Sequence, residues 1–564
     1  MSNAISTFLA NSFWFASCLP DATMFHLATR NVQRTQRALL EKLLRENADT
    51  EFGRRHHFAS IRSLEDFRER VPLSTYDDYR EAIEQMTNGA ANVLTAHRVT
   101  LFEPTSGSSA PTKLIPYTAS LKREFNRGIA PWIANLYAHN PALFFGKSYW
   151  SVSPAAQRST RTAGGTPIGF EDDAQYLGGV QQFLSRSVLA APSSLRSIQD
   201  MEQFRHQTLL HLLECRSLGL ISVWNPSFLL LLMESLAKKW LPLTCQICNR
   251  RRAAEVREIF QSETDSAVIH TRLWPHLKVI SCWTDAFAAR HAAEVQRLFP
   301  QARLQGKGLI ATEGFISFPM CSRERQRVDK NVHRPLAHAR SYPDETPALS
   351  IRSHFFEFLS ENGTIRLAHE LEEDATYSVV LTTSGGLYRY QLHERIQVVG
   401  HHRQCPLIRF VGKEAHVSDR FGEKLNEQHV QRALGESLQQ ARLNPSFTLM
   451  SCEEFDGRFA YTLFVETSET SDERLAILAD ALEMQLQENF HYRYCRDLGQ
   501  LEALRIFRIE SRGLETFLSE SQRKGQRLGD VKPLLLSRHD GWTQAFRGRL
   551  VSLSAELPHF DSED

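Results

Sequence analysis

The sequence predicts an α/β fold, because helical and strand-like patterns alternate along the chain. The opening ~70 residues are predicted to be mostly helical, with one apolar stripe formed by Leu39, Leu40, Leu43 and Leu44. Further on, residues 377–381 and 387–392 are typical of two strands around the turn Ser384-Gly385-Gly386, and residues 407–411 predict a third strand that ends at Gly412.

A smaller α+β unit is predicted after this third strand. Residues 447–452 and 459–465 are strand candidates joined by Asp456-Gly457, a strong hairpin signal. Residues 470–473 look like a capping box, and residues 504–509 form a last strand candidate. The helix between them is expected to place Leu475, Leu478, Leu482, Leu486 and Phe490 on one face.

Composition is that of an ordinary globular protein. The 564 residues are 42% hydrophobic and 23% charged, with a formal net charge of +1, which predicts two to four domains and no nucleic-acid partner. The most apolar run, residues 228–233, is far shorter than the ~20 residues that cross a bilayer, so we expect a buried helix and no membrane association. No Lys or Arg precedes Arg30, so no secretory signal is expected.

The nine cysteines have no paired framework, which predicts reduced thiols in a cytoplasmic protein. Cys245 and Cys248 form the only CxxC, without a second pair to complete a zinc site. The default oligomeric state is a monomer.

A hydroxyl-rich segment, Thr105-Ser106-Gly107-Ser108-Ser109, follows a strand-like start and precedes Lys113. Small residues expose backbone N–H groups, hydroxyls add donors and an ammonium offsets negative charge, so this segment suits an oligophosphate. The same composition is also typical of an ordinary turn. It is not a Walker loop, and none occurs elsewhere in the chain.

Three other segments carry charged groups in turn-like surroundings. Residues 305–314 are a short apolar strand running into Thr312-Glu313-Gly314, where a carboxylate could hold magnesium against phosphate. Residues 387–394 end in Glu394, which could accept hydrogen bonds from ribose hydroxyls. Residues 525–533 place Lys532 on a stretch that also holds Gly525 and Gly529, and by itself this stretch is simply a basic loop.

The order of these segments resembles the adenylate-forming superfamily, which includes acyl-CoA synthetases and nonribosomal adenylation domains. Five further motifs are FGR at 52–54, RVPLSTY at 70–76, KLIPYT at 113–118, ISVWNP at 221–226 and FGEKL at 421–425. Together they resemble the Gretchen Hagen acyl-acid amido synthetases, and the resemblance runs from about residue 35 to about residue 535.

The resemblance implies a fold and a reaction. The fold would be a large N-terminal domain, residues 1–411, with mixed sheets, a β-barrel and flanking helices, and a smaller mobile domain, residues 412–564. The reaction would use ATP and Mg²⁺ to convert a carboxylic acid into an acyl adenylate with loss of pyrophosphate. An amine, expected to be an amino acid, would then expel AMP.

Residue roles follow from the resemblance. The phosphates would lie against the hydroxyl-rich segment, with Ser106 and Ser108 as catalytic donors, and Lys532 would neutralise the transferring phosphate. Glu313 would bind magnesium and take part in catalysis, beside Ala311 and Thr312. Glu394 would hold the ribose, and Lys413 is a hinge or nucleotide contact that is equally compatible with an exposed strand end. Ser222, Val223 and Trp224 are candidate walls of the acyl-acid pocket.

Two departures and two alternatives remain open. Glu394 stands where the family usually has aspartate, and Ala110 where related loops often have glycine, so ATP use could be weakened. A thiol, such as coenzyme A or a carrier-protein arm, could replace the amine as acceptor. A family member that binds ligand without turnover is the other alternative.

Overall fold

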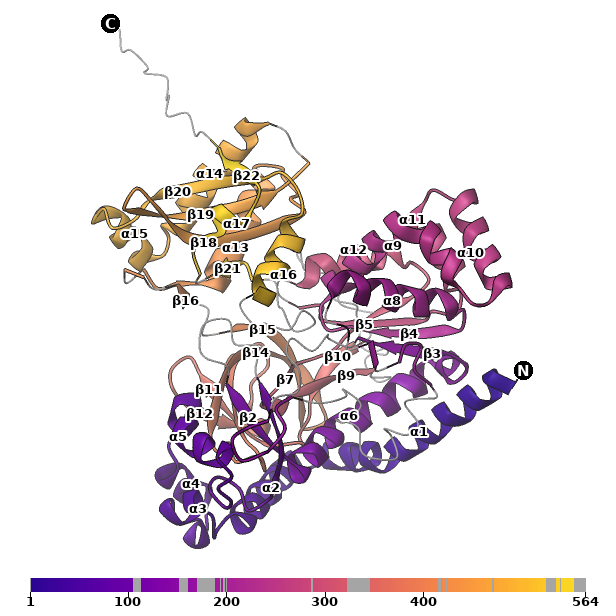
Figure 1. Cartoon of the computed structure of the whole chain (residues 1–564). Helices are drawn as coiled ribbons and strands as arrows, with labels where there is room; N and C mark the ends of the chain where they lie inside the picture. The colour runs from indigo at the N-terminus through magenta and orange to yellow at the C-terminus, as the bar shows by residue number, and fades with distance from the viewer. Residues whose placement is uncertain are drawn as a thin grey trace, which may run out of the picture. The chain divides into compact units, whose positions relative to one another are not determined.

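The computed structural model divides into two compact units; among the described residues, the larger ends at Val411 and the smaller begins at Gly412 (Figure 1). It describes residues 2–104, 113–151, 161–169, 188–192, 194–195, 198, 200–285, 288–321, 345–413, 417–418, 420–421, 423–468, 471–523, 534–537 and 539–551.

The N-terminal part of the larger unit is helical, as predicted. In α2, the stripe of Leu40, Leu43 and Leu44 is buried against Phe58 and Phe67. Ser63 and Thr75 start α4 and α5 with capping boxes, in which Asp66 and Asp78 return the hydrogen bond. The helices are α1 (Ser2–Ala28), α2 (Val32–Glu46), α3 (Glu51–Arg55), α4 (Leu64–Arg70) and α5 (Tyr76–Thr87).

A four-stranded parallel sheet, of order β3-β4-β5-β6, follows in the larger unit. Its strands are β3 (Lys147–Trp150), β4 (Leu218–Ser222), β5 (Val279–Cys282) and β6 (Arg303–Gly306). The apolar run 228–233 lies inside α9 (Pro226–Gln246), so the predicted helix is confirmed. Other helices around this sheet are α6 (Ala119–His139), α8 (Met201–Glu214), α10 (Arg250–Ser262), α11 (Ser266–Leu273) and α12 (Ala288–Leu298).

A seven-stranded sheet, of order β12-β11-β13-β14-β15-β10-β9, completes the larger unit. The predicted strand at 387–392 begins only at Tyr390, because Gly386 and Arg389 have positive φ angles of 103° and 50° and belong to the turn. The strands are β9 (Ser317–Cys321), β10 (Glu345–Leu349), β11 (Phe355–Ser360), β12 (Ile365–Leu367), β13 (Thr376–Thr382), β14 (Tyr390–His402) and β15 (Cys405–Lys413).

Two short hairpins pack into the same core as this sheet. β1 (Val99–Pro104) pairs antiparallel with β2 (Leu114–Thr118), and β7 (Ile310–Ala311) pairs with β8 (Gly314–Phe315). Phe102, Tyr117 and Phe315 are all buried in one hydrophobic cluster. The core therefore holds the two hairpins that carry predicted site residues.

The smaller unit has the predicted strand, strand, helix, strand order. The β18 (Phe447–Phe455) and β19 (Arg458–Glu466) hairpin turns at Asp456 and Gly457, whose φ angles are 51° and 78°. After α14 (Asp472–Leu486), β20 (Glu502–Ile509) pairs parallel to β19.

One detail of this prediction is wrong: Phe490 starts α15 (Phe490–Asp497) and is 61% exposed, because α14 ends at Leu486. Short strands β21 (Leu536–Ser537) and β22 (Gly548–Leu550) flank the sheet, with α13 (Glu427–Gln440), α16 (Gly513–Arg523) and α17 (Trp542–Ala545) alongside. The predicted α/β class, with a larger N-terminal and a smaller C-terminal unit, is confirmed.

Candidate active site

The β1–β2 hairpin is fastened to the Thr312-Glu313-Gly314 turn. Tyr117 Oη, from β2, donates a hydrogen bond to the carbonyl oxygen of Thr312 at 2.7 Å. The hydroxyl-rich segment falls between these two strands in the sequence, and Thr105, Ser106, Gly107, Ser108, Ser109 and Ala110 lie outside the described residues. The paired strands on either side of this segment therefore lie beside the acidic turn.

Glu313 lies half-buried between β7 and β8, with Ala311 and Thr312 just before it. Its carboxylate shares a hydrogen bond with Tyr390, and burial and the Glu313 charge together raise the pKa of that phenol. Burial, opposed by a hydrogen bond to the Leu114 backbone, also raises the pKa of Tyr76, and the Glu313 charge adds to the rise. Two neutral phenols thus surround one carboxylate.

Tyr76 also joins this group to the base of the β1–β2 hairpin. Its hydroxyl accepts a hydrogen bond from the Leu114 backbone N–H at 2.8 Å. Lys113 Nζ lies 5.5 Å from the centre of the Tyr76 ring, which is within the range of a cation–π contact. A carboxylate and an ammonium thus flank one aromatic ring, and such a set suits a phosphate chain with a bound cation.

A buried His–Glu pair holds the backbone just after Glu313. His354 Nε2 accepts the Phe315 backbone N–H at 3.0 Å, which leaves Nδ1 to donate to Glu124 Oε2, also at 3.0 Å. A Cβ added at Gly314 would lie 3.1 Å from the His354 ring, so glycine permits this close approach. The Ser384 backbone N–H donates to the same Glu124 oxygen at 3.1 Å. The acidic turn and the turn before β14 therefore share one buried anchor.

Glu394 lies in an irregular part of β14. Opposite β13, Gln391 pairs with Val380 and Arg395 pairs with Ser378, so extra residues bulge from β14 between them. His393 has a φ of 58° within this bulge, and Glu394 is 3% exposed. Bulges of this kind redirect side chains next to functional sites.

Arg389, from the same predicted segment, has a structural role. Its guanidinium pairs with Glu357 at 2.8 Å and donates to the Val71 carbonyl at 2.7 Å. Arg68 pairs with the other Glu357 oxygen at 2.8 Å. Residues 68–76 and 388–391 are therefore held together, although they lie about 320 positions apart.

The predicted acyl-acid residues lie at the carboxyl edge of the parallel sheet. Ser222 ends β4 and accepts a hydrogen bond from Lys307 Nζ at 2.6 Å. Val223 is fully buried and Trp224 is half-buried, 5.0 Å from the same ammonium. Ligands of open α/β sheets bind outside this edge, so the position is compatible with a pocket wall.

The two remaining predicted lysines are less defined. Lys413 is the last residue of β15, where its backbone is described and its side chain is not. Lys532 lies outside the described residues. Both stay predictions.

Sequence reasoning missed Lys307, Glu124, His354 and the phenols of Tyr76 and Tyr390 as members of the site. Tyr76 and Tyr390 stand within quoted motifs, so their position in those motifs was the available signal. Glu124 and His354 lie 230 positions apart and carry no local pattern.

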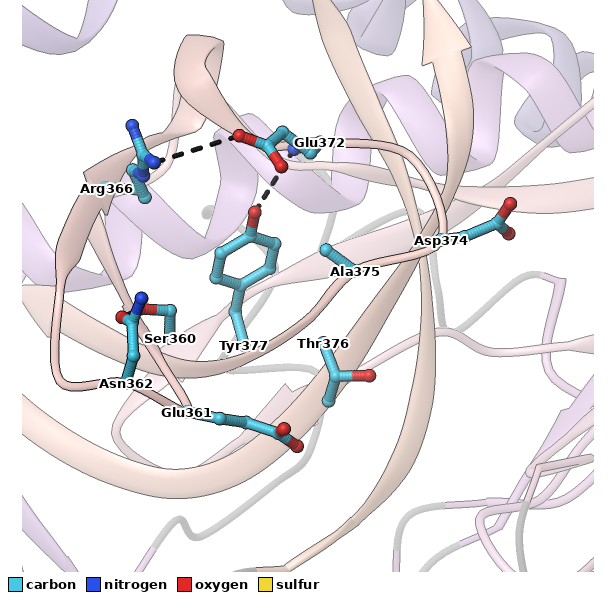
Figure 2. Close-up of a pocket in the computed structure, with 9 residues that line it drawn as sticks. All are labelled: Ser360, Glu361, Asn362, Arg366, Glu372, Asp374, Ala375, Thr376 and Tyr377. Atoms are coloured by element: carbon cyan, nitrogen blue, oxygen red, sulfur yellow. Dashed lines mark hydrogen bonds and ion pairs between the residues drawn. The ribbon is translucent and has the colours of Figure 1, made fainter.

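A separate hollow of about 460 Å³ lies between β11, β12 and β13 (Figure 2). Arg366 pairs there with Glu372 at 3.8 Å, while Glu361 and Asp374 add negative charge. None of its lining residues was predicted as a site residue, and its charged rim suits a solvated surface. Within the described ranges, no three His, Cys, Asp or Glu side chains are grouped to hold a metal, and no helix could cross a membrane.

Solved structures identify the class of fold. The AtGH3.15 acyl acid amido synthetase in complex with 2,4-DB matches with a TM-score of 0.80 at 20% identity, over 95% of this chain and 97% of that chain. A second GH3.15 acyl acid amido synthetase structure gives 0.78 at 19% identity, over 96% and 98%. The protein therefore has the fold of the acyl acid amido synthetases.

The family follows from the sequence models. The GH3 family N-terminal, central and C-terminal domains match residues 22–251, 348–413 and 428–540. The putative indole-3-acetic acid-amido synthetase GH3.10 of Oryza sativa subsp. japonica is 26% identical over 486 residues, which cover 82% of this chain and 96% of the relative. Indole-3-acetic acid-amido synthetase GH3.3 of Arabidopsis thaliana is 22% identical over 589 residues, 95% of each chain. The chain belongs to the GH3 family, and the resemblance read from the motifs is confirmed.

Proposed function

We propose that the protein is an ATP-dependent acyl-acid amido synthetase. It activates a carboxylic acid as an acyl adenylate, releases pyrophosphate, and transfers the acyl group to an amine, expected to be an amino acid. Family membership supports the reaction class. The hydrogen bond from Tyr117 to Thr312 is the structural observation that carries the proposal, because it joins the hydroxyl-bearing hairpin to the acidic turn.

The acidic turn is suited to magnesium. Mg²⁺ takes oxygen ligands and commonly uses one or two carboxylates together with substrate phosphates. Glu313 supplies such a carboxylate, half-buried at a turn whose backbone is held from both sides by Tyr117 and His354. When bound, the cation would neutralise charge that develops on the phosphates.

The chain's own groups would orient the nucleotide. The backbone and hydroxyls of Thr105 to Ser109, with Ser106 and Ser108 as donors, would cradle the phosphates, and Lys113 would offset their charge. Ala311 and Thr312 would lie beside the nucleotide. Glu394, buried in the β14 bulge, would accept hydrogen bonds from the ribose hydroxyls.

The smaller unit would serve the two half-reactions in turn. Gly412, with a φ of 147°, and Lys413 stand where the two units divide, which makes them candidate hinge residues. Lys532 would neutralise the α-phosphate during adenylation only. Lys532→Ala should then slow acid-dependent ATP–pyrophosphate exchange while amide formation from supplied acyl adenylate continues.

The deciding experiment is a screen for pyrophosphate release with Mg²⁺, a panel of acids and the common amino acids. Indole-3-acetate is the first acid to test, since relatives are named for it. Mass spectrometry with competing amine and thiol acceptors separates an amide product from a thioester. Calorimetry that detects neither ATP nor AMP binding in the presence of magnesium would refute the proposal.

The remaining expectations concern the cellular setting. All nine cysteines lie within the described residues and all are free thiols, which supports a reducing, cytoplasmic location. A monomeric state is proposed as well, and light scattering tests it.

A further inference from the structure

Lys307 is a fully buried lysine at the carboxyl edge of the parallel sheet, directly after β6. It is 2% exposed. Its ammonium lies 4.9 Å from the Trp132 ring centre, 5.4 Å from that of Trp150 and 5.0 Å from that of Trp224. Three aromatic faces therefore surround one buried cation.

The only hydrogen bond of this ammonium to a described side chain goes to Ser222, at 2.6 Å. No carboxylate of the described residues forms an ion pair with it, and the nearby thiol of Cys282 is neutral because burial raises its pKa to about 12. A buried cation without an anion is strongly disfavoured, and cation–π contacts compensate only part of that cost. The cluster is therefore complementary to a negative group, and none of the described residues supplies one.

The neighbouring strands add hydrogen-bonding groups in one row. Trp150, Ser222, Ser281 and Gln305 are register partners across β3, β4, β5 and β6, so they share one face of the sheet. Strands of a buried parallel sheet are usually apolar on both faces, which makes a polar row at the carboxyl edge unusual.

Two members of this row have unused polar atoms. The indole N–H of Trp150 and the Ser281 hydroxyl are both buried. Neither forms a hydrogen bond with any of the described residues. Gln305, in contrast, accepts the Trp132 indole N–H at 3.0 Å and so fixes that ring. Among the described residues, two donors without acceptors thus lie in the same row as Ser222, which contacts the buried ammonium.

We propose that Lys307 binds a carboxylate of the acyl acid, with the Trp150 N–H as a second donor and the Trp150 and Trp224 rings as walls of the pocket. The inference rests on the proposed amido synthetase function. Trp150 and Trp224 are the partly exposed rings of the cluster, so the acid enters beside them. The carboxylate is either the group that is adenylated or a second acidic group of the same molecule.

Lys307→Met is the direct test, because methionine keeps a similar length against the aromatic rings and removes the charge. Acid-dependent ATP–pyrophosphate exchange is measured with benzoate, phenylacetate and indole-3-acetate, which have one carboxylate, and with phthalate and adipate, which have two. We expect KM for the acid to rise about tenfold to hundredfold, the usual loss for a hydrogen bond to a charged group, with KM for ATP unchanged.

Two variants serve as controls. Lys238→Met removes an exposed lysine of α9 that pairs with Glu234, and should leave both constants unchanged. Trp150→Phe keeps an aromatic wall and removes the indole N–H, and should raise KM for the acid by a smaller factor. Thermal melting of each variant confirms that the fold is kept, and Trp150→Phe decides the question if Lys307→Met does not fold.

The acid panel identifies which carboxylate Lys307 holds. A rise in KM for every acid assigns it to the reacting group, and a rise for phthalate and adipate alone assigns it to a second group. Unchanged KM values in both variants would overturn the inference and leave the amido synthetase function standing.

If no acid supports exchange, the proposed function fails, and calorimetry still decides the inference. Wild-type protein should bind benzoate or phenylacetate more tightly than benzamide or phenylacetamide, and Lys307→Met should lose this preference. Equal or absent binding of acid and amide by the wild type would overturn it.

Discussion

Two substitutions of His354 can separate the anchoring of the acidic turn from the stability of the larger unit, because each keeps one of the two hydrogen bonds of this side chain. An asparagine at this position places an amide nitrogen near Nδ1, so it keeps the donor to Glu124 and leaves the Phe315 N–H without an acceptor. A glutamine places its amide oxygen near Nε2, so it keeps the acceptor for Phe315 and loses the contact with Glu124. His354 and the two hydrogen bonds are completely buried, so neither loss is repaired by bulk water.

The magnitudes of the two losses are similar. An unpaired buried N–H costs about 1–3 kcal/mol, and a lost hydrogen bond to a charged group costs about 1.5–3 kcal/mol. Glu124 keeps the Ser384 N–H in both variants. We therefore expect His354→Asn and His354→Gln to lower the free energy of unfolding of the larger unit by comparable amounts in urea.

The activities of the two variants should differ. In His354→Asn the backbone after Glu313 is released, and a misplacement of about 1 Å can cost about a hundredfold in rate. In His354→Gln the backbone stays held, so kcat for pyrophosphate exchange should remain close to that of the wild type. Equal kcat values in the two variants, at equal folded fraction, would refute a positioning role for His354.

Three further predictions concern charged groups of the larger unit. Glu313→Gln should raise the Mg²⁺ concentration needed for half-maximal exchange by tenfold or more, roughly the value of a charged ligand, and an unchanged Mg²⁺ dependence would exclude a metal role. Arg389→Met removes one of the two arginines that pair with the buried Glu357, and should cost about 1.5–3 kcal/mol in urea unfolding because Arg68 keeps its own pair. The exposed pair removed by Arg37→Met should cost below about 1 kcal/mol. Burial lowers the pKa of Lys307 from 10.5 to about 7, so the free protein loses this proton above pH 7 while the unfolded chain keeps it to about pH 10.5. Acid binding should thus weaken as pH rises above about 7, while stability without acid should rise over the same range by up to about 1.4 kcal/mol per pH unit, and Lys307→Met should remove both slopes.

The sequence predicts the smaller unit well because its signals are local. The Asp456-Gly457 turn requires positive φ at two adjacent residues, and leucines spaced three to four residues apart mark α14. Phe490 was misplaced because apolar periodicity continues across the end of a helix, whereas the chain leaves α14 after Leu486. Local pattern cannot reveal which apolar residue stays exposed.

The Lys307 cluster shows why part of the site could not be predicted. Its rings come from α6, the end of β3 and the start of the loop after β4, and the lysine follows β6. In the sequence, Lys307 stands between two glycines and is typical of an exposed turn. Only the register of four parallel strands brings Trp150, Ser222 and Ser281 into one row.

The strained backbone near Glu394 also depends on contacts between residues that lie far apart in the sequence. Positive φ angles at Arg389 and His393 each cost of order 1 kcal/mol, so the surrounding contacts must hold them. The Arg389 pair with Glu357 and the Ser74 to Arg389 backbone hydrogen bond, at 3.0 Å, provide such contacts for the first of these residues. In a regular β14 without the bulge, side chains would alternate between the two faces of the sheet, and the position of Glu394 along the strand would alone decide which face it is on. The bulge instead sets the direction of Glu394 apart from that alternation, which suits the contact with the ribose that we propose for its carboxylate.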